Sequence, residues 1–303
     1  MRAPSFVIGF VLCGLLAQPV AGQTKGRGNA FGHAKGSASA GAAASTAGGA
    51  ASTAGAPAAD FGGGPAPDTG VRNFGAWLDD ASVLAPGGGF SSFSVGYWRL
   101  ASFTEVDAPS FDVAFGLTKR VQAGASVPVY HASAPGLPAT RGLGDLYLSS
   151  KIQLREPAPG TFGFAVIPLI QVLSAEPVQG SARVSWALPV SVEYQGTGWR
   201  TYGSTGYFSR GSLFASAAIE RALSNRLWAT GTLSQSHSVK EDATADSLGL
   251  SANRTDVSGG VTWAASDAVA LFGAVGRTLG RDDGSATKLF LSGGLSIAWV
   301  VRD

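Results

Sequence analysis

The sequence lacks several features of an ordinary soluble protein. Its one cysteine, Cys13, lies in an apolar run near the start, so a disulfide framework and a cysteine metal site are both excluded. Charged residues make up only 14% of the chain, whereas soluble proteins carry about 25%. The net charge of +2 gives no reason to expect a nucleic-acid partner.

Long apolar runs are also absent from most of the chain. Phe6–Leu16 is apolar, but a membrane helix needs about 20 such residues. Arg2 precedes this run and small residues follow it, so residues 1–22 are predicted to be a secretory signal peptide cleaved before Gln23. A membrane anchor and lipidation of Cys13 are the alternatives. An exported chain with little charge and no membrane helix needs another way to face lipid, and alternating strands provide one.

Two segments follow the predicted signal peptide. Residues 23–67 are rich in Gly, Ala, Ser and Thr and cannot bury enough apolar surface to order themselves, so we predict a disordered periplasmic linker. Residues 68–86 contain larger apolar side chains, among them Trp77 and Leu84. This short N-terminal segment is compatible with a helix, an extra strand or a plug, and the sequence does not choose between them.

A period of two begins near Gly87 and continues to the end of the chain. Apolar residues alternate with small or polar ones in the ranges 111–118, 183–195 and 289–299. Successive side chains of a strand point to opposite faces, so each of these segments has one apolar side and one polar side. Residues 87–303 are therefore predicted to be all β.

Twelve such segments can be counted, with starts near residues 88, 110, 121, 143, 161, 183, 198, 211, 226, 251, 268 and 287. Most are as long as a tilted membrane strand of about 9–11 residues, whereas the strands of a β-sandwich have about 5–6. Tight connections alternate with long ones, such as Leu100 to Pro109, as in outer-membrane barrels. The predicted fold is a transmembrane, antiparallel, up-and-down β-barrel of about 12 strands with a disordered N-terminal tail.

Aromatic side chains near the ends of the segments agree with this fold. Amphipathic rings gather at membrane–water interfaces, so these residues are predicted to form aromatic belts. They are Tyr97, Trp98, Tyr194, Trp199, Trp228, Trp263 and Trp299.

The polar faces of the segments cannot lie against lipid, because a Lys or Arg at mid-bilayer costs about 2–4 kcal/mol. We therefore predict that the charged residues of these faces point into the lumen. The candidates are Asp112, Asp145, Lys151, Arg155, Arg183, Glu193, Arg254 and Asp256. A mixed-charge constriction is expected around Asp145, Lys151, Arg183 and Glu193, and it would restrict passage to small solutes.

One of these segments also resembles a known family. Residues 142–151 read GLGDLYLSSK and resemble the G-x-G-D-x-x-x-x-x-K stretch of outer-membrane barrels called transporters or meta-pathway phenol-degradation proteins. Gly96–Trp98 and Gly206–Gly211 are similar to the same family, and the resemblance covers about residues 70–303. It implies uptake of small, hydrophobic or aromatic molecules. The chain departs from the family at Ile167–Ile170, where a Pro-Thr-Gly is often found.

The last segment resembles the signal by which the barrel-insertion machinery recognises its clients. Ser292, Gly294, Ile297 and Trp299 occupy the polar, glycine, apolar and aromatic positions of that signal, although the usual terminal aromatic is absent. The predicted partners are therefore this machinery, the lipid of the outer membrane and a small hydrophobic solute. The sequence gives no oligomeric state.

No catalytic constellation is evident in the sequence. The histidines are His33, His131 and His237, and the serines beside His237 would point away from it because neighbours on a strand face opposite sides. Metal-ligand spacings and phosphate-binding glycine motifs are absent, so no enzyme, metal or cofactor is predicted. The predicted function is a channel or carrier in the bacterial outer membrane, with the N-terminal tail in the periplasm. The alternative is a non-conducting barrel with a structural or surface-interaction role.

Overall fold

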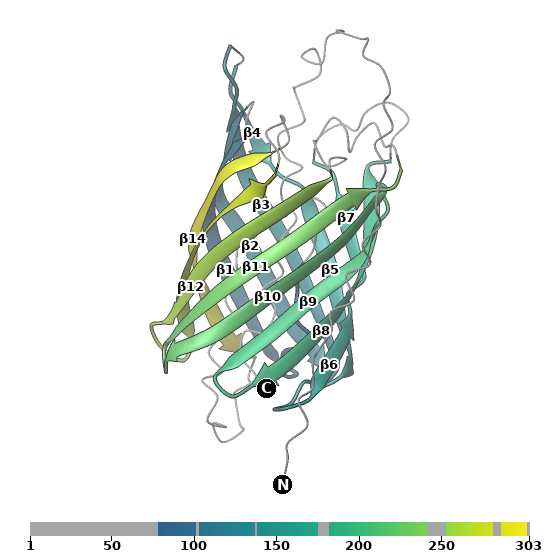
Figure 1. Cartoon of the computed structure of the whole chain (residues 1–303), viewed down its shortest axis with the longest axis vertical. Coiled ribbons are helices and arrows are strands. Elements are labelled where there is room, and N and C mark those ends of the chain that lie inside the picture. Colours follow the sequence, from purple (N-terminus) through teal and green to yellow (C-terminus); the bar gives the residue numbers. More distant parts are fainter. Residues whose placement is uncertain are drawn as a thin grey trace. The chain divides into compact units, whose positions relative to one another are not determined.

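The computed structural model describes residues 78–100, 103–136, 138–174, 182–240, 253–280 and 286–301 (Figure 1). The predicted signal peptide and the predicted linker lie outside these ranges, as do residues 68–77 of the short N-terminal segment. Within the described ranges, no helix is long and apolar enough to cross a membrane.

The described residues form one antiparallel sheet of 14 strand segments. The segments are β1 (Gly88–Leu100), β2 (Thr104–Thr118), β3 (Val121–Ser133), β4 (Thr140–Leu143), β5 (Leu146–Arg155), β6 (Phe162–Val166), β7 (Leu169–Val172), β8 (Val184–Gly196), β9 (Trp199–Phe208), β10 (Ser212–Ser224), β11 (Leu227–Ser238), β12 (Arg254–Ala264), β13 (Val269–Leu279) and β14 (Thr287–Val300).

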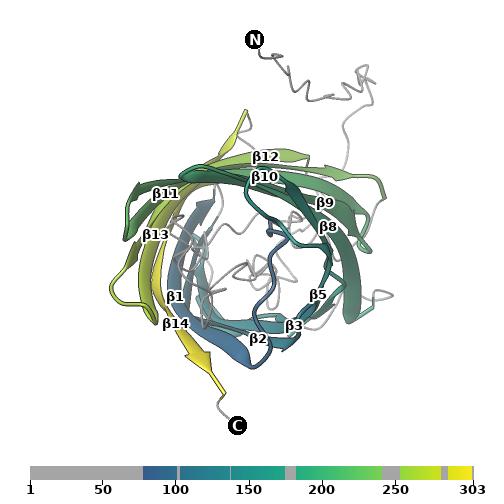
Figure 2. The same ribbon diagram turned by 90° about the horizontal axis from the view of Figure 1, so that it is seen from below.

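Two of the barrel strands are interrupted, so the 14 segments make 12 barrel strands. β4 and β5 both pair with β3 and are separated at Gly144–Asp145. β6 and β7 both pair with β8 and are separated at Ile167–Pro168, where the proline has no N–H to continue the ladder. β1 pairs with β14 along its whole length, which closes the sheet into a barrel and confirms the predicted fold (Figure 2).

The barrel has an apolar outer face and a polar inner face. Along β8 the side chains of Trp186, Leu188 and Val190 are exposed by 52%, 46% and 44%, whereas Ser191 and Glu193 are fully buried. The exposed row is the surface that a bilayer would cover, because charged and polar side chains are costly against hydrocarbon. The buried row points to the lumen.

The second strand begins earlier than the sequence pattern predicts. β2 starts at Thr104 rather than near residue 110, so much of the loop expected from Leu100 to Pro109 belongs to a strand. Its pairing is irregular between Asp107 and Ser110, beside Pro109. Proline is compatible with a strand at such a bulge, where the ladder hydrogen bond is already lost.

Two of the predicted belt residues lie inside the barrel instead. Trp98 and Trp228 are exposed by only 4% and 5%, because each occupies an inward position of its strand. Trp98 packs against Leu100 and Phe290, with the rings of Trp98 and Phe290 5.1 Å apart. Nearness to a strand end therefore did not decide which face these rings occupy, and the prediction for them was wrong.

The segment that precedes β1 enters the lumen. Residues 78–85, called the inner segment below, have no regular secondary structure and run across the barrel opening in Figure 2. Asp79, Asp80, Ala81 and Leu84 are exposed by 2% or less. Of the three structures compatible with the sequence here, the described part of the segment has the position of a plug.

A glycine on β2 lets the end of the inner segment approach the wall. A Cβ atom built on Gly116 would lie 2.2 Å from the carbonyl oxygen of Ala85 and 2.6 Å from that of Leu84, which no side chain can occupy. Gly87 follows at φ +77°, a conformation that glycine adopts easily, and donates its N–H to the Gly116 carbonyl at 3.0 Å. The chain can therefore turn from the lumen directly into β1.

Candidate functional site

Lys151 on β5 is the main anchor of the inner segment. Its ammonium nitrogen lies 2.7 Å from Asp79 Oδ1 and 2.8 Å from Asp80 Oδ1, and it also donates to the Ser82 carbonyl at 3.0 Å. These three acceptors use all three of its N–H donors. Because the side chains of Lys151, Asp79 and Asp80 are at most 1% exposed, these ion pairs are shielded from water.

Arg200 on β9 holds the same segment from another part of the barrel wall. Its Nη1 donates to Asp80 Oδ2 at 3.1 Å. Its Nε and Nη2 donate to the two carboxylate oxygens of Glu220 on β10, at 2.8 and 3.3 Å. The guanidinium also lies over the ring of Tyr202, 4.9 Å from its centroid. Asp80 is therefore shared between two cations on strands that lie apart in the barrel wall.

Polar side chains of the wall also bind the backbone of the inner segment. Glu193 Oε2 accepts from the Ala81 N–H at 3.2 Å, and Gln153 donates to the Ala81 carbonyl at 3.0 Å. Gln122 accepts from the Leu84 N–H at 2.9 Å. Side chains from β3, β5 and β8 thus satisfy backbone groups that would otherwise be buried without a partner, which is costly in the absence of water.

The two ends of the inner segment pack against opposite parts of the wall. Leu78 contacts Tyr202 on β9 and Ala218 on β10, whereas Leu84 contacts Phe90 on β1 and Ala114 on β2. In the order of the 12 strands these two places are roughly half the circumference apart. The inner segment therefore crosses the lumen and does not follow one wall.

Asp145 belongs to a different group, in the break between β4 and β5. Its carboxylate accepts from Gln171 Nε2 at 2.8 Å and from the Ser174 N–H at 3.0 Å. Arg183 is exposed just before β8 begins and donates to the carbonyls of Leu173 and Ser174. The predicted constriction is therefore not one cluster: Lys151 and Glu193 meet at the inner segment, while Asp145 and Arg183 lie by the connection after β7.

Of the four remaining lumen candidates, three are buried inside the barrel and one is exposed at the end of a strand. Asp112, Arg254 and Asp256 are buried, with exposures of 5%, 4% and 7%. Arg155 is exposed at the end of β5, where the pairing with β6 shifts after Gln153 and turns the side chain away from the interior. The period of two placed Arg155 and Arg183 in the lumen, because alternation does not show where a strand ends or becomes irregular.

The four residues of the predicted insertion signal lie on β14, next to the closing strand β1. Ile297 is 39% exposed on the outer face. Trp299 stacks on Phe115 with ring centroids 5.8 Å apart and donates its ring N–H to Ser91 at 3.2 Å. Gly294 allows close approach, since a Cβ there would lie 2.3 Å from the Phe93 carbonyl oxygen. Ser292 shares the face of Gly294, and the signal itself stays a prediction.

Sequence reasoning missed the partners that the inner segment uses. Arg200 and Glu220 alternate correctly with apolar residues, so the period of two would have placed them inside as well. The adjacent Asp79 and Asp80 are not a distinctive signal by themselves, because Glu241–Asp242 and Asp282–Asp283 are adjacent acids as well. No group of three His, Cys, Asp or Glu side chains within the described ranges could hold a metal ion.

Comparison with known proteins identifies the fold. No family model and no curated protein matches the chain. Among solved structures, an outer membrane channel from Pseudomonas putida F1 is similar with a TM-score of 0.56 and 14% identity, over 73% of this chain and 98% of that one. The chain therefore shares the β-barrel fold of this outer membrane protein.

Two porins are also similar, at lower scores. A NanC porin gives a TM-score of 0.49 with 7% identity, over 70% of this chain and all of its own. A KdgM porin in complex with disordered oligogalacturonate gives 0.47 with 5% identity, over 69% of this chain and 99% of its own. The barrel fold that the family resemblance implied agrees with the first of these neighbours, and the family itself stays a prediction.

The anchoring of the inner segment is expected to resist mild acid. Burial alone would raise the pKa of Asp80, but the charges of Lys151 and Arg200 and the hydrogen bonds it accepts bring that pKa below its ordinary value of 3.8. A carboxyl whose pKa is lowered by its ion pairs stabilises the anchored segment fully at pH values above the ordinary pKa. This stabilisation is lost as the pH falls through the lowered pKa. The segment should therefore stay protected from protease at about pH 5 and be released only in strong acid. Release near neutral pH in a proteolysis series would contradict this assignment of Asp80.

Proposed function

We propose that this chain is a channel or carrier of the bacterial outer membrane that passes small solutes through the barrel. The observation that carries the proposal is the polar lumen, in which buried charged side chains face an inner segment of the same chain. Barrels of about eight strands are filled by their own side chains, whereas larger ones leave interior space. A lumen that accommodates a crossing segment of chain has room for a small solute once that segment moves.

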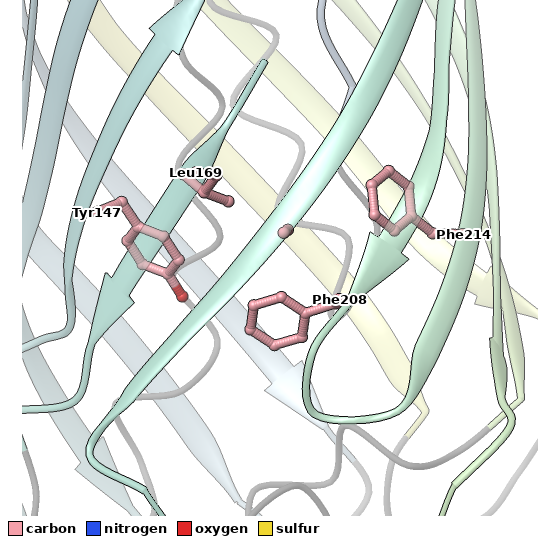
Figure 3. Packing of buried hydrophobic residues seen from close by; sticks show 5 residues of the cluster. Tyr147, Leu169, Phe208 and Phe214 are labelled. Atoms are coloured by element: carbon pink, nitrogen blue, oxygen red, sulfur yellow. The ribbon is translucent and has the colours of Figure 1, made fainter. Parts of the chain in front are cut away.

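Hydrophobic or aromatic solutes fit the lumen because part of its wall is apolar. Tyr147, Leu169, Phe208 and Phe214 form one buried cluster with Ala187, contributed by five strand segments (Figure 3). Trp98, Leu100 and Phe290 form a second cluster on β1 and β14, across the barrel from the first. Rings on two sides of a lumen favour solutes that have an apolar face. The family resemblance on Gly142–Lys151 agrees with this substrate class.

A non-conducting barrel is the second candidate function, and the anchoring of the inner segment favours it. Lys151 and Arg200 hold that segment with buried ion pairs, which would keep the lumen closed if nothing releases them. In this alternative the barrel has a structural or surface-interaction role. The two functions differ in one measurable property, the passage of solute.

The place of the barrel in the cell is part of the proposal. The exposed apolar face would contact outer-membrane lipid. Gly87 and Val301 are hydrogen bonded at one end of the barrel, the end that also has the tight turns after β2, β8 and β10. Short turns face the periplasm in such barrels, so the N-terminal tail would be periplasmic. The β14 signal would direct insertion by the barrel-insertion machinery.

Solute passage through the purified full chain tests the proposal. In liposome-swelling assays we expect small solutes to enter vesicles that contain the protein faster than empty vesicles. We also expect the protein to fractionate with outer membranes and to migrate on gels in a heat-modifiable way. A folded, heat-modifiable protein that passes no small solute and shows no conductance in planar bilayers would establish the non-conducting alternative. Recovery of the mature chain in a detergent-free soluble fraction would overturn both.

A further inference from the structure

Buried hydroxyl groups without a hydrogen-bond partner occur on several strands of the inner wall and are most frequent on β10 and β11. Ser216 on β10 and Thr230, Ser234 and Ser236 on β11 are exposed by 8% or less, and their side-chain oxygens are unpartnered. These four residues are called the hydroxyl wall. Ser216 and Ser234 are cross-strand neighbours, and the inward positions of β11 from Ser236 to Thr230 extend over about 20 Å of strand. The hydroxyl wall therefore forms a track along the barrel and not an isolated spot.

Unpartnered buried hydroxyls call for an explanation, because nearly all buried polar groups in native proteins are hydrogen bonded. Between Thr230 and Ser234 the chain does supply a partner: Thr232 on β11 and Ser258 on β12 are hydrogen bonded to each other at 2.7 Å. The hydroxyl wall lacks such a pairing although its residues are adjacent. Water or a solute can supply hydrogen bonds to such groups.

The surroundings of the hydroxyl wall indicate the charge of that solute. Asp256 and Arg254 are the cross-strand neighbours of Ser234 and Ser236. They bind each other through two hydrogen bonds of 2.8 and 2.7 Å, so their charges are largely neutralised locally. Neither an anion nor a cation gains a free counter-ion from this pair. A hydroxyl group both donates and accepts, which suits a neutral solute that carries hydroxyl or amide groups.

The hydroxyl wall adjoins one end of the inner segment: Ser204, the cross-strand neighbour of Ser216, accepts the Asp79 N–H at 3.2 Å. Glu220, the cross-strand neighbour of Thr230, is the carboxylate that Arg200 holds. The other anchors, Gln122 on β3 and Lys151 on β5, lie across the 12-strand barrel from β11. On its other side the hydroxyl wall adjoins an apolar surface, because Phe214 of the aromatic cluster is the cross-strand neighbour of Ser236. A solute with a hydroxylated face and an apolar face would match both surfaces.

We propose that the hydroxyl wall is a binding track for neutral, hydroxyl-bearing solutes within the lumen. The inference rests on the proposed function and deepens it by assigning the solute class and the wall that the solute follows. Ser216, Ser234 and Ser236 exchange hydrogen bonds with the solute as its water is removed, and Phe214 contacts its apolar face. Losing one such hydrogen bond corresponds to about a two- to tenfold weaker interaction.

Cysteine protection tests the track in the full-length protein. Ser234→Cys places a thiol on the hydroxyl wall, whereas Ala218→Cys places one on an inward position that Leu78 and Tyr202 cover. We expect a small water-soluble thiol reagent to modify position 234, and a neutral polyol to slow this reaction several-fold. An organic cation and an organic anion at the same concentration should not slow it. Modification at 218 should be independent of polyol.

A second set of variants separates a binding role from a structural one. The triple variant Ser216→Ala/Ser234→Ala/Ser236→Ala should keep or raise the melting temperature, because it removes buried groups without partners. Its swelling rate with polyols should fall several-fold. The control Thr232→Val should lower the melting temperature, because it leaves Ser258 without its partner.

The outcomes distinguish this inference from the proposed function. If solutes cross the barrel but polyol fails to protect position 234 and the triple variant swells normally, the track is wrong and the channel stands. If polyol protects position 234 but nothing crosses the membrane, the track is a binding site in a non-conducting barrel. A thiol at position 234 that does not react while one at position 122 does would also overturn the track.

Discussion

Removing the inner segment is expected to raise the conductance of the barrel about tenfold or more, which corresponds to removing a barrier of about 1.4 kcal/mol. The segment crosses the lumen, with Leu78 against one part of the wall and Leu84 against another. The test replaces residues 78–85 by a Gly/Ser stretch of equal length, which cannot form the ion pairs or the apolar contacts. Single-channel conductance in planar bilayers measures the result.

Accessibility gives an independent readout of the same change. Gln122→Cys places a thiol under the inner segment, and Ile152→Cys places one on the outer face. Replacing the segment should expose position 122 to a water-soluble reagent and leave position 152 reactive only toward a lipid-soluble one. The matched control replaces residues 60–67 by Gly/Ser and should change neither readout. Unchanged conductance in a folded variant would mean that the inner segment does not limit passage.

Replacing Lys151 by methionine is expected to release the inner segment without deleting it. The change leaves the carboxylates of Asp79 and Asp80 buried beside an apolar side chain, and removing one partner of a buried ion pair costs about 3–5 kcal/mol. Limited proteolysis should then cleave the segment in the folded barrel, and conductance should approach that of the Gly/Ser variant. Heat-modifiable migration checks that the barrel has folded.

A compensating substitution shows whether charge is the cause. Lys151→Met/Asp79→Asn removes one of the two carboxylates that the ammonium had neutralised, while Asp80 keeps its ion pair with Arg200. This double variant should recover part of the protection that Lys151→Met loses. Lys119→Met, at an exposed turn, should change stability by less than about 0.5 kcal/mol. If the single and double variants lost the same amount of protection from protease, the effect would be due to packing and not to charge.

The sequence alone was sufficient to predict the barrel fold, because the information that specifies a strand is local. Side chains alternate between two faces, so Lys151 and Ile152 can be assigned to opposite sides from their neighbours alone, and they are exposed by 2% and 38%. The same period counts the strands, apart from the early start of β2 at Thr104. Trp98 and Trp228 were predicted to lie at the membrane interface because they are near strand ends, although alternation places both on the inner face, where they are buried.

Only the tertiary structure decided what occupies the lumen. Asp79 and Asp80 have no periodic pattern around them, and the cations that bind them come from β5 and β9, 71 and 120 residues along the chain from Asp80. The break at Asp145 and the irregular end of β5 also depend on contacts with neighbouring strands, so they separated residues that alternation alone had placed in one constriction. Alternation fixes which face a side chain occupies, whereas its partner across the lumen is set by barrel closure, which brings together residues distant in sequence.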